Sequence, residues 1–366
     1  MTIAGHVEGL RLVDHHVHGA FRGALDAAGL AAGLTESPFP APDGTSYLDS
    51  PLGFAVRRWC APVLDLPPHA PIGDYLARRA GLGTAEVNRR FLAGAGLAEL
   101  LVDTGYRGAE LLSPAELGAA AGAAAREIVR LEAVAEDVAA AGVEPAEFAA
   151  AFADAVAARA AGAAGLKSVI AYRHGLDLPV RPPSATAVTA AARGWLEVGG
   201  PLADPVLLAH VVWTGVATGL PVQFHVGYGD PDLTLHRSDP SLLTPFLRAV
   251  SSPVVLLHCY PFHRTAAYLA AVFPHVHLDV GLTMNHVGAR AAAVLAEVWE
   301  VAPFAKVLYS SDAFGPAELH FLGARLWRTA VTTVLDERVA AGDWSAADAR
   351  RVAELTGSGN ARRIYG

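Results

Sequence analysis

The sequence predicts an α/β protein built as a (β/α)8 TIM barrel, distorted and with a helical insertion after its first strand. Three observations support this prediction. Eight short apolar segments recur along the 366 residues, helix-like stretches separate most of them, and no GxGxxG motif follows the first segment. Continuously apolar strands alternating with helices are typical of parallel sheets. Eight of them favour a closed barrel over an open dinucleotide-binding sheet.

The predicted elements follow one another in a regular order. The strands are short and rich in Val, Leu and Ile, and they cover residues 10–14, 99–103, 128–133, 166–172, 221–225, 253–258, 275–279 and 306–310. The helices are Ala-rich or amphipathic, and they cover residues 114–124, 137–164, 202–217, 240–250, 262–273, 289–300 and 316–340. Because no linker interrupts this alternation, we expect one domain over residues 1–366.

Two segments fall outside the alternation. Residues 20–95 separate the first two strands and are too long for a simple βα loop. Long loops in compact domains are usually functional, so we expect a lid-like insertion over the barrel mouth. Residues 344–366 contain Ser345, a suitable N-cap, and are expected to form a C-terminal helix that stops near Gly357.

The composition restricts the classes of partner and compartment. A formal charge of −8 argues against nucleic acid or an anionic membrane surface. The Ala-rich stretches carry charged residues and the N-terminus has no signal-peptide pattern, so we expect neither a membrane span nor secretion. Cys60 and Cys259 lack the spacing of a thiolate site, which favours a reducing, cytoplasmic location. Fifteen histidines against two methionines direct attention to histidine chemistry.

The first predicted strand runs into the sequence DHHVH, residues 14–18. Side chains two positions apart in a strand point to the same side. His16 and His18 are therefore expected to converge inside the barrel, whereas His15 points away and is interpreted as structural.

Three later strand ends offer further ligand side chains. His225 ends the fifth predicted strand, His258 ends the sixth, and Asp312 follows the eighth. Barrel enzymes carry their catalytic groups at the C-terminal ends of the strands. Any one of these histidines alone would more often be structural, but together they predict a divalent metal site with an open position for water. Zinc is the first choice, with manganese, iron and nickel also compatible, and Asp312 is placed to transfer a proton from metal-activated water.

Lys167 lies at the start of the otherwise apolar fourth predicted strand. A buried ammonium group is unfavourable unless it is neutralised or paired. Two outcomes stay open at this point. The side chain is carboxylated and bridges two metals, or it pairs with an acidic neighbour.

Four residues are weaker candidates for substrate binding: Tyr172, Arg173, Asp103 and Tyr228. Arg173 follows the fourth predicted strand, and a guanidinium binds a carboxylate through two hydrogen bonds. Pairing of Arg173 with an acidic residue at the rim is an equal alternative. Capping of a loop is the equal alternative for Asp103.

Taken together, these motifs resemble the amidohydrolase superfamily. DHHVH, the later single histidines and Asp312 carry this resemblance, and GNARRIYG (359–366) is typical of the amidohydrolase-2 branch. Four further motifs are similar to the amidohydrolase-like domain of nodulin/FluG-type proteins: GLKSVIAYRHGL (165–176), HVGYGD (225–230), LLHCYPFHR (256–264) and LYSSDAFG (308–315).

The resemblance implies a metal centre in a distorted TIM barrel. His16, His18 and Asp312 would hold a first metal, with His225 as a further ligand. His258 would bind a second metal or orient the water, which makes it a catalytic candidate together with Asp312.

Lys167 matches the position where members of the superfamily with two metals carry a bridging carbamate. The implied activity is hydrolysis of an amide or related C–N bond in a small polar substrate. In the nodulin/FluG-type relatives the domain is fused to a glutamine-synthetase-like domain, for which these 366 residues contain no counterpart. A γ-glutamyl amide and a functional pairing with a glutamine-synthetase-like enzyme are therefore reasonable expectations.

Two other functions stay open. The same branch includes metal-dependent decarboxylases, which are lyases. The other alternative is a non-enzymatic partner of a glutamine-synthetase-like protein, which the presence of every expected ligand type disfavours. A homo-oligomer such as a dimer is a further expectation, based only on the frequency of such assemblies.

Overall fold

The computed structural model describes residues 2–366, and at its centre is a curled parallel sheet. Seven strands follow one another in sequence order. They are β1 (Leu12–Val17), β2 (Leu97–Asp103), β3 (Ala124–Arg130), β4 (Gly165–Ser168), β5 (Val222–Val226), β6 (Val254–His258) and β7 (Val276–Leu278). Every residue of β1 and of β4 to β7 is buried, as expected for strands covered on both faces. The predicted parallel sheet is confirmed.

The predicted eighth strand, residues 306–310, does not form a regular ladder. It makes a single parallel bridge to β7, where the Leu308 N–H donates to the Leu278 carbonyl at 2.9 Å. On its other side, the His15 N–H donates to the Tyr309 carbonyl at 3.2 Å. This segment therefore lies between β7 and β1 and connects the two edges of the sheet through irregular backbone.

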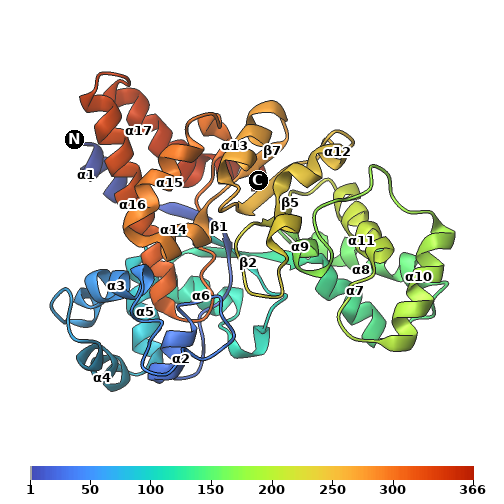
Figure 1. Cartoon of the computed structure of the whole chain (residues 1–366), viewed down its shortest axis with the longest axis horizontal. Helices are drawn as coiled ribbons and strands as arrows, with labels where there is room; N and C mark the ends of the chain where they lie inside the picture. Colours follow the sequence, from blue (N-terminus) through green and yellow to red (C-terminus); the bar gives the residue numbers. More distant parts are fainter. Residues whose placement is uncertain (1) are drawn as a thin grey trace.

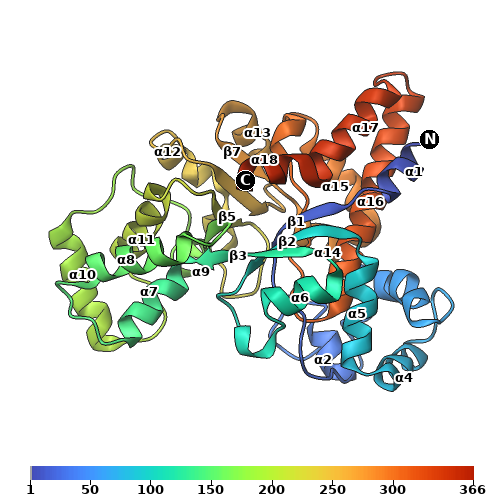
Figure 2. The ribbon, with the colours of Figure 1, turned by 180° about the vertical axis from the view of Figure 1, so that it is seen from behind.

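Helices surround the sheet (Figures 1 and 2). Those outside the β1–β2 connection are α1 (Ile3–Glu8), α6 (Pro114–Ala121), α7 (Leu131–Ala140), α8 (Phe148–Ala160), α9 (Ile170–Arg173), α10 (Ala185–Val198), α11 (Pro205–Ala217), α12 (Thr244–Leu247), α13 (His263–Val272), α14 (Gly281–Val287), α15 (Ala291–Val298), α16 (Ala317–Ala340), α17 (Ala346–Glu354) and α18 (Asn360–Tyr365). Among residues 2–366, no helix combines the length and the apolar character that crossing a membrane requires.

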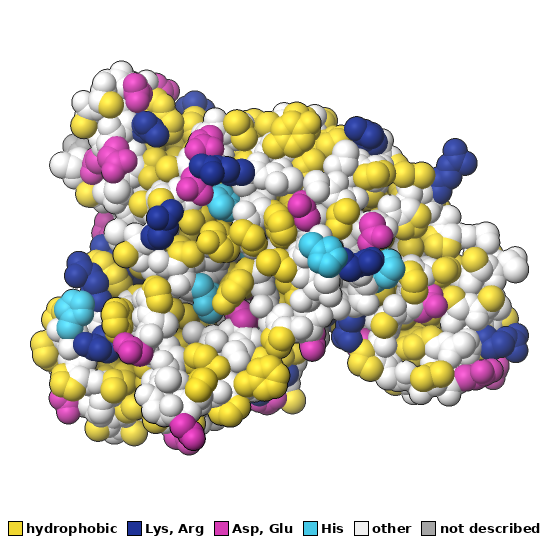
Figure 3. Space-filling model, viewed as in Figure 1, with side chains coloured by type: hydrophobic (Ala, Val, Ile, Leu, Met, Phe, Trp, Pro, Cys, Tyr) yellow, Lys and Arg dark blue, Asp and Glu magenta, His cyan; other side chains and the backbone are white. Residues whose placement is uncertain are grey.

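Several of these helical regions differ from the prediction, including α1 and α14, which were not predicted. The single helix expected over 137–164 is two helices, α7 and α8, because Gly142 adopts φ 80° and Pro145 follows it. Helix α10 was not predicted, although Ser184 caps it by accepting from the Ala187 N–H at 3.2 Å. Helices α7, α8, α10 and α11 form a lobe that projects at the right of Figures 1 and 3.

The connection between β1 and β2 contains α2 (Ala27–Ala32), α3 (Pro51–Ala55), α4 (Ile72–Leu82) and α5 (Thr84–Gly94). These helices lie together at the lower left of Figure 1. The extended segment between α2 and α3 contains turns and bends and is largely exposed or half-buried.

The C-terminal region starts as predicted but does not stop near Gly357. Ser345 caps α17 by accepting from the Asp348 N–H at 3.0 Å. The chain then continues through a wider helical turn, residues 355–359, into α18. A Cβ atom at Gly357 would lie 2.8 Å from the Trp327 side chain and 3.0 Å from that of Leu12. This glycine therefore serves close packing rather than helix termination.

Candidate metal centre

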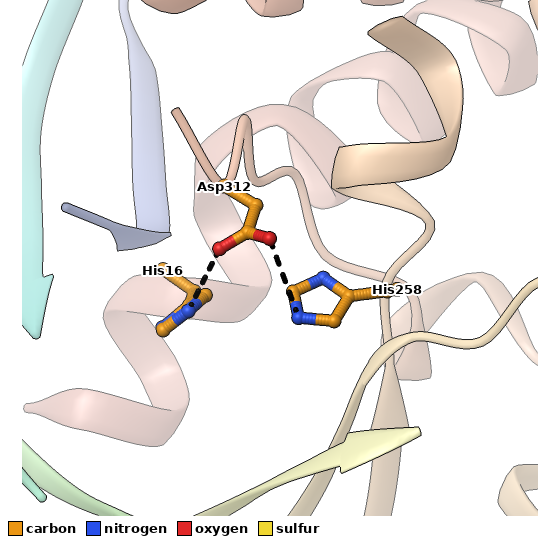
Figure 4. A group of neighbouring side chains, drawn as sticks. All are labelled: His16, His258 and Asp312. Carbon is orange, nitrogen blue, oxygen red and sulfur yellow. Dashed lines mark ion pairs between the residues drawn. The ribbon is translucent and has the colours of Figure 1, made fainter. Parts of the chain in front are cut away.

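Histidines at the ends of two strands meet around Asp312. Its Oδ1 lies 3.0 Å from His16 Nε2 and 3.5 Å from His18 Nε2, and its Oδ2 lies 3.5 Å from His258 Nε2. Figure 4 shows the Asp312 carboxylate between the rings of His16 and His258. His16 lies in β1 and His258 ends β6, so the curvature of the sheet is what brings them together.

Two more predicted ligand residues complete this cluster. The His225 ring, from β5, lies 4.8 Å from the His258 ring. The amine of Lys167, from β4, lies 2.8 Å from His16 Nε2. The structure thus brings together all six residues that the sequence analysis named as metal ligands: His16, His18, Lys167, His225, His258 and Asp312.

Burial keeps the imidazoles neutral. It lowers the pKa of His18 to about 3 and lowers the pKa values of His16, His225 and His258 well below the usual range. Burial also raises the pKa of Asp312 to about 6. A neutral imidazole is the form that binds a metal ion.

The donor set fits a divalent cation. The buried Nε2 atom of His225 has no hydrogen-bond partner in the part of the chain that the structure describes, and burying such an atom is unfavourable unless a ligand satisfies it. Ligand atoms of His16, His258 and Asp312 lie within 4.8 Å of one another. Imidazole nitrogens with a carboxylate oxygen suit zinc and other first-row metals.

Lys167 also contacts Asp103, one of the predicted substrate-binding residues. Its amine lies 3.3 Å from Asp103 Oδ2, and Arg130 Nη2 donates to the same oxygen at 2.6 Å. Burial alone would raise the pKa of Asp103, but Arg130 and Lys167 hold it well below the usual range. Asp103 does not line the cavity, and pairing with an acidic neighbour is the arrangement that Lys167 adopts here.

Arg130 is a cavity residue that the sequence analysis missed. The third strand was predicted at 128–133, which places Arg130 in its middle. The observed β3 ends at Arg130, the position at which barrel proteins carry functional groups. A strand predicted to end at residue 130 would have identified Arg130 as a candidate functional residue.

Hydrogen bonds to a buried carboxylate hold the backbone next to Asp312. Asp312 adopts φ 49°, a left-handed conformation that is uncommon for a residue other than glycine. The preceding residue, Ser311, donates its N–H to Asp14 at 3.0 Å and its hydroxyl to the same carboxylate at 2.6 Å. Asp14, unassigned from the sequence, is therefore a buried support for this turn.

His15 lies behind the cluster, in agreement with its structural interpretation. It is fully buried, with Nε2 2.9 Å from Asp279 and Nδ1 3.2 Å from the Tyr365 hydroxyl. Gln223 donates to the same hydroxyl at 2.9 Å. A polar network thus lies beneath the candidate ligands.

The cluster opens into a cavity of about 1570 Å³. Residues of the β1–β2 connection between 21 and 48 form much of its opposite wall, and Tyr172 and Arg173 also line it. These two residues lie on α9 because β4 ends earlier than predicted, and Arg173 lies 3.7 Å from Glu136. The fourth predicted substrate residue, Tyr228, does not line the cavity.

Comparison with known proteins places the chain in a family. The amidohydrolase-2 family model, described as Amidohydrolase, matches residues 61–366, and the chain belongs to this family. The resemblance seen in the motifs is confirmed. A crystal structure from Lactobacillus casei, described as that of a metal-dependent hydrolase, is similar over 100% of this chain and 97% of its own, with TM-score 0.86 and 28% identity.

One relative is only partly matched, and one further solved structure has a similar fold. Protein fluG of Emericella nidulans is 32% identical over 218 residues, which is 55% of this chain and 25% of fluG. The chain thus matches about a quarter of that relative's length. A glucuronate isomerase from Caulobacter crescentus has TM-score 0.68 and 16% identity over 99% of this chain and 92% of its own, a likeness that shows the fold alone.

Proposed function

We propose that this chain is a metal-dependent hydrolase of an amide or related C–N bond in a small polar substrate. One observation carries the proposal: buried, neutral histidines and one carboxylate converge at the strand ends and face a large cavity. Membership of the amidohydrolase family and the similarity to the Lactobacillus casei protein support the same class of reaction.

His16, His18 and Asp312 would hold a first divalent cation, with His225 and His258 as further ligands. Such a cation supplies Lewis acidity and makes bound water a stronger acid. Zinc is the metal that we propose, because nitrogen and carboxylate donors suit it. Lys167 stays in the proposed ligand set because burial lowers its pKa, and a carbamate forms from a neutral amine.

Asp312 is the proposed proton carrier. Its side chain is 11% exposed and lines the cavity, so one oxygen can reach a substrate. As a carboxylate, Asp312 can accept a proton from attacking water and release it to the leaving nitrogen. Where its Nε2 does not bind the cation, a neutral His258 would instead donate a hydrogen bond to the substrate carbonyl oxygen.

The side chains of the cavity wall favour a substrate that carries one positive and one negative group. Arg130 and Arg173 line it, and so do the carboxylates of Glu36 and Asp230. A γ-glutamyl amide has an α-carboxylate and an α-ammonium group that match these two kinds of side chain. We propose Tyr172 and Arg173 as the carboxylate-binding pair and residues 20–95 as a lid-like wall that selects the substrate. A separate glutamine-synthetase-like enzyme would supply or consume such a compound.

Metal analysis and a product assay test this proposal. The purified chain should retain a divalent metal and release ammonia or an amine from γ-glutamyl amides. Asp312→Asn should lower kcat about 10²–10⁴-fold, the usual contribution of a general acid–base group. Release of carbon dioxide instead of an amine would identify a decarboxylase, and failure to retain any supplied metal would favour a non-enzymatic role.

A further inference from the structure

Strand β6 ends in a backbone conformation that needs support. His258 and the next residue, Cys259, adopt φ values of 65° and 60°. For residues with a Cβ atom, this left-handed conformation is unfavourable. Such conformations persist when the surroundings hold them, and they concentrate at functional sites. Here they determine the direction in which the His258 ring leaves the strand.

Asp279, directly after β7, holds this strand end. It is fully buried, and its Oδ1 accepts from the His258 N–H at 3.1 Å and from the Gly281 N–H at 2.7 Å. The Thr283 hydroxyl donates to the His258 carbonyl at 3.1 Å. Both backbone groups of His258 are therefore bound by side chains from the segment that follows β7.

The His258 ring itself lacks the usual support. Metal-binding histidines normally use their second ring nitrogen to donate to a carboxylate or carbonyl, which fixes the ring. Among residues 2–366, the buried Nδ1 atom of His258 has no hydrogen-bond partner. Orientation through the backbone is thus the support that the structure provides for this ring.

We infer that Asp279, together with Thr283, is a positioning residue that directs His258 toward the metal centre. Asp279 is not itself a ligand candidate, because it does not line the cavity and its second oxygen lies 2.9 Å from His15 Nε2. This inference rests on the proposed metal centre. The experiment therefore distinguishes a missing metal centre from a missing positioning role of Asp279.

The experiment is a Co²⁺ titration of the full chain after metal removal, followed by visible absorption. Asp279→Ala should raise the Kd for Co²⁺ about 10–100-fold, the usual effect of losing a group that supports a ligand. Asp279→Asn should stay within about 3-fold of the unsubstituted chain, because the amide oxygen still accepts from both backbone N–H groups. Thr283→Val, which has nearly the same shape, should weaken binding less than Asp279→Ala but measurably.

Glu318→Gln is the matched control for loss of a buried carboxylate. Glu318 is fully buried and binds Arg79 at 2.8 Å, outside the cavity wall. This variant should lose stability and keep its Co²⁺ affinity. Equal weakening by Glu318→Gln and Asp279→Ala would attribute the effect to stability and overturn the inference, as would Asp279→Asn binding as poorly as Asp279→Ala.

The remaining outcomes are also decisive. No Co²⁺ binding by the unsubstituted chain would contradict the metal centre, and with it the proposed function. Normal binding with unchanged affinity in Asp279→Ala and Thr283→Val would leave the metal centre standing and remove the positioning role. If Asp279→Ala does not fold, as judged by circular dichroism, Thr283→Val decides alone.

Discussion

The inner wall of the cavity is formed by strand ends, whereas its outer wall is formed by residues 21–48 of the connection after β1. On the inner wall, Lys167, His225 and His258 are almost completely buried and come from separate strands. The outer wall is mostly exposed or half-buried, and its hydrogen bonds are local, as between the Thr45 hydroxyl and the Pro42 carbonyl at 2.6 Å.

This difference indicates that the inner wall determines the chemistry and the outer wall determines which substrate binds. The inner wall cannot move without disturbing the sheet, because its groups are fixed by buried strands or, for Asp312, by hydrogen bonds from Ser311 to Asp14 in β1. The outer wall can change in sequence with little effect on the sheet, as surface loops generally can. We therefore expect substitutions on the inner wall to affect stability and metal binding, and substitutions on the outer wall to affect substrate affinity.

The largest expected effect comes from the buried ion pair on the inner wall. Arg130→Met leaves Asp103 with Lys167 as its remaining charged partner. Loss of one partner of a buried pair usually costs about 3–5 kcal/mol, and we expect the free energy of unfolding to fall by about 3 kcal/mol in urea denaturation. Arg89→Met, which removes a pair that is largely exposed, should leave the transition unchanged. If the two variants unfolded at the same urea concentration, the buried ion pair would contribute no more to stability than the exposed one, and the prediction would be wrong.

Removal of a candidate ligand comes next. His16→Ala should lower metal affinity and activity by at least about 10²-fold, the upper range for a group that only supports a ligand. Metal content by mass spectrometry and kcat/KM are the measurements. His236→Ala removes an exposed histidine outside the cavity and should change neither. Full metal content in His16→Ala would remove this residue from the centre.

Acid pH should have a smaller effect, a loss of stability caused by a buried histidine. Burial lowers the pKa of His320 on α16 to about 3, against about 6.5 in the unfolded chain. Below pH 6.5 the unfolded state therefore binds a proton that the folded state does not, and stability falls as the pH drops toward 3. His320→Leu should reduce this loss by about 1.4 kcal/mol per pH unit between pH 6 and 4. Parallel stability curves for the two proteins would show that His320 is protonated without unfolding.

The smallest effect is expected on the outer wall. Phe39 is 66% exposed and lines the cavity. Phe39→Ala should change the free energy of unfolding by less than about 0.5 kcal/mol. It should raise KM for the substrate roughly 3-fold, equivalent to about 0.6 kcal/mol, with metal content unchanged. A loss of metal in this variant would show that the two walls are not independent.

The sequence predicted the inner wall because position in a strand determines direction. His16 and His18 lie two residues apart, which is sufficient to place them on one side, and their rings lie 5.3 Å apart. His225 and His258 were found because each lies at the end of a short, mostly apolar run. The parallel order of the strands then brings these ends together, so a local pattern predicted a long-range cluster.

Other features have no comparable signal in the sequence. The left-handed backbone at His258 and Asp312 is not marked by glycine, so the turns that present these side chains were not foreseen. The apolar run at 306–310 resembles a strand but forms one irregular bridge to β7. The path of residues 21–48 depends on local turns without periodic apolar residues, which is why the outer wall was predicted only as a lid-like segment.

The hydrogen bond between His15 and Tyr365 joins residues 350 positions apart. Asp14 and Ser311, which hold the turn before Asp312, are separated by 297 positions. Ribosomes add about 5–20 residues per second, so roughly 20–70 s pass between the synthesis of His15 and that of its partner. During this interval the histidines of the growing chain lack the long-range hydrogen bonds that fix the backbone around them. Capture of a metal ion in the final geometry is therefore a late event in the life of each molecule, after most of the chain has been made.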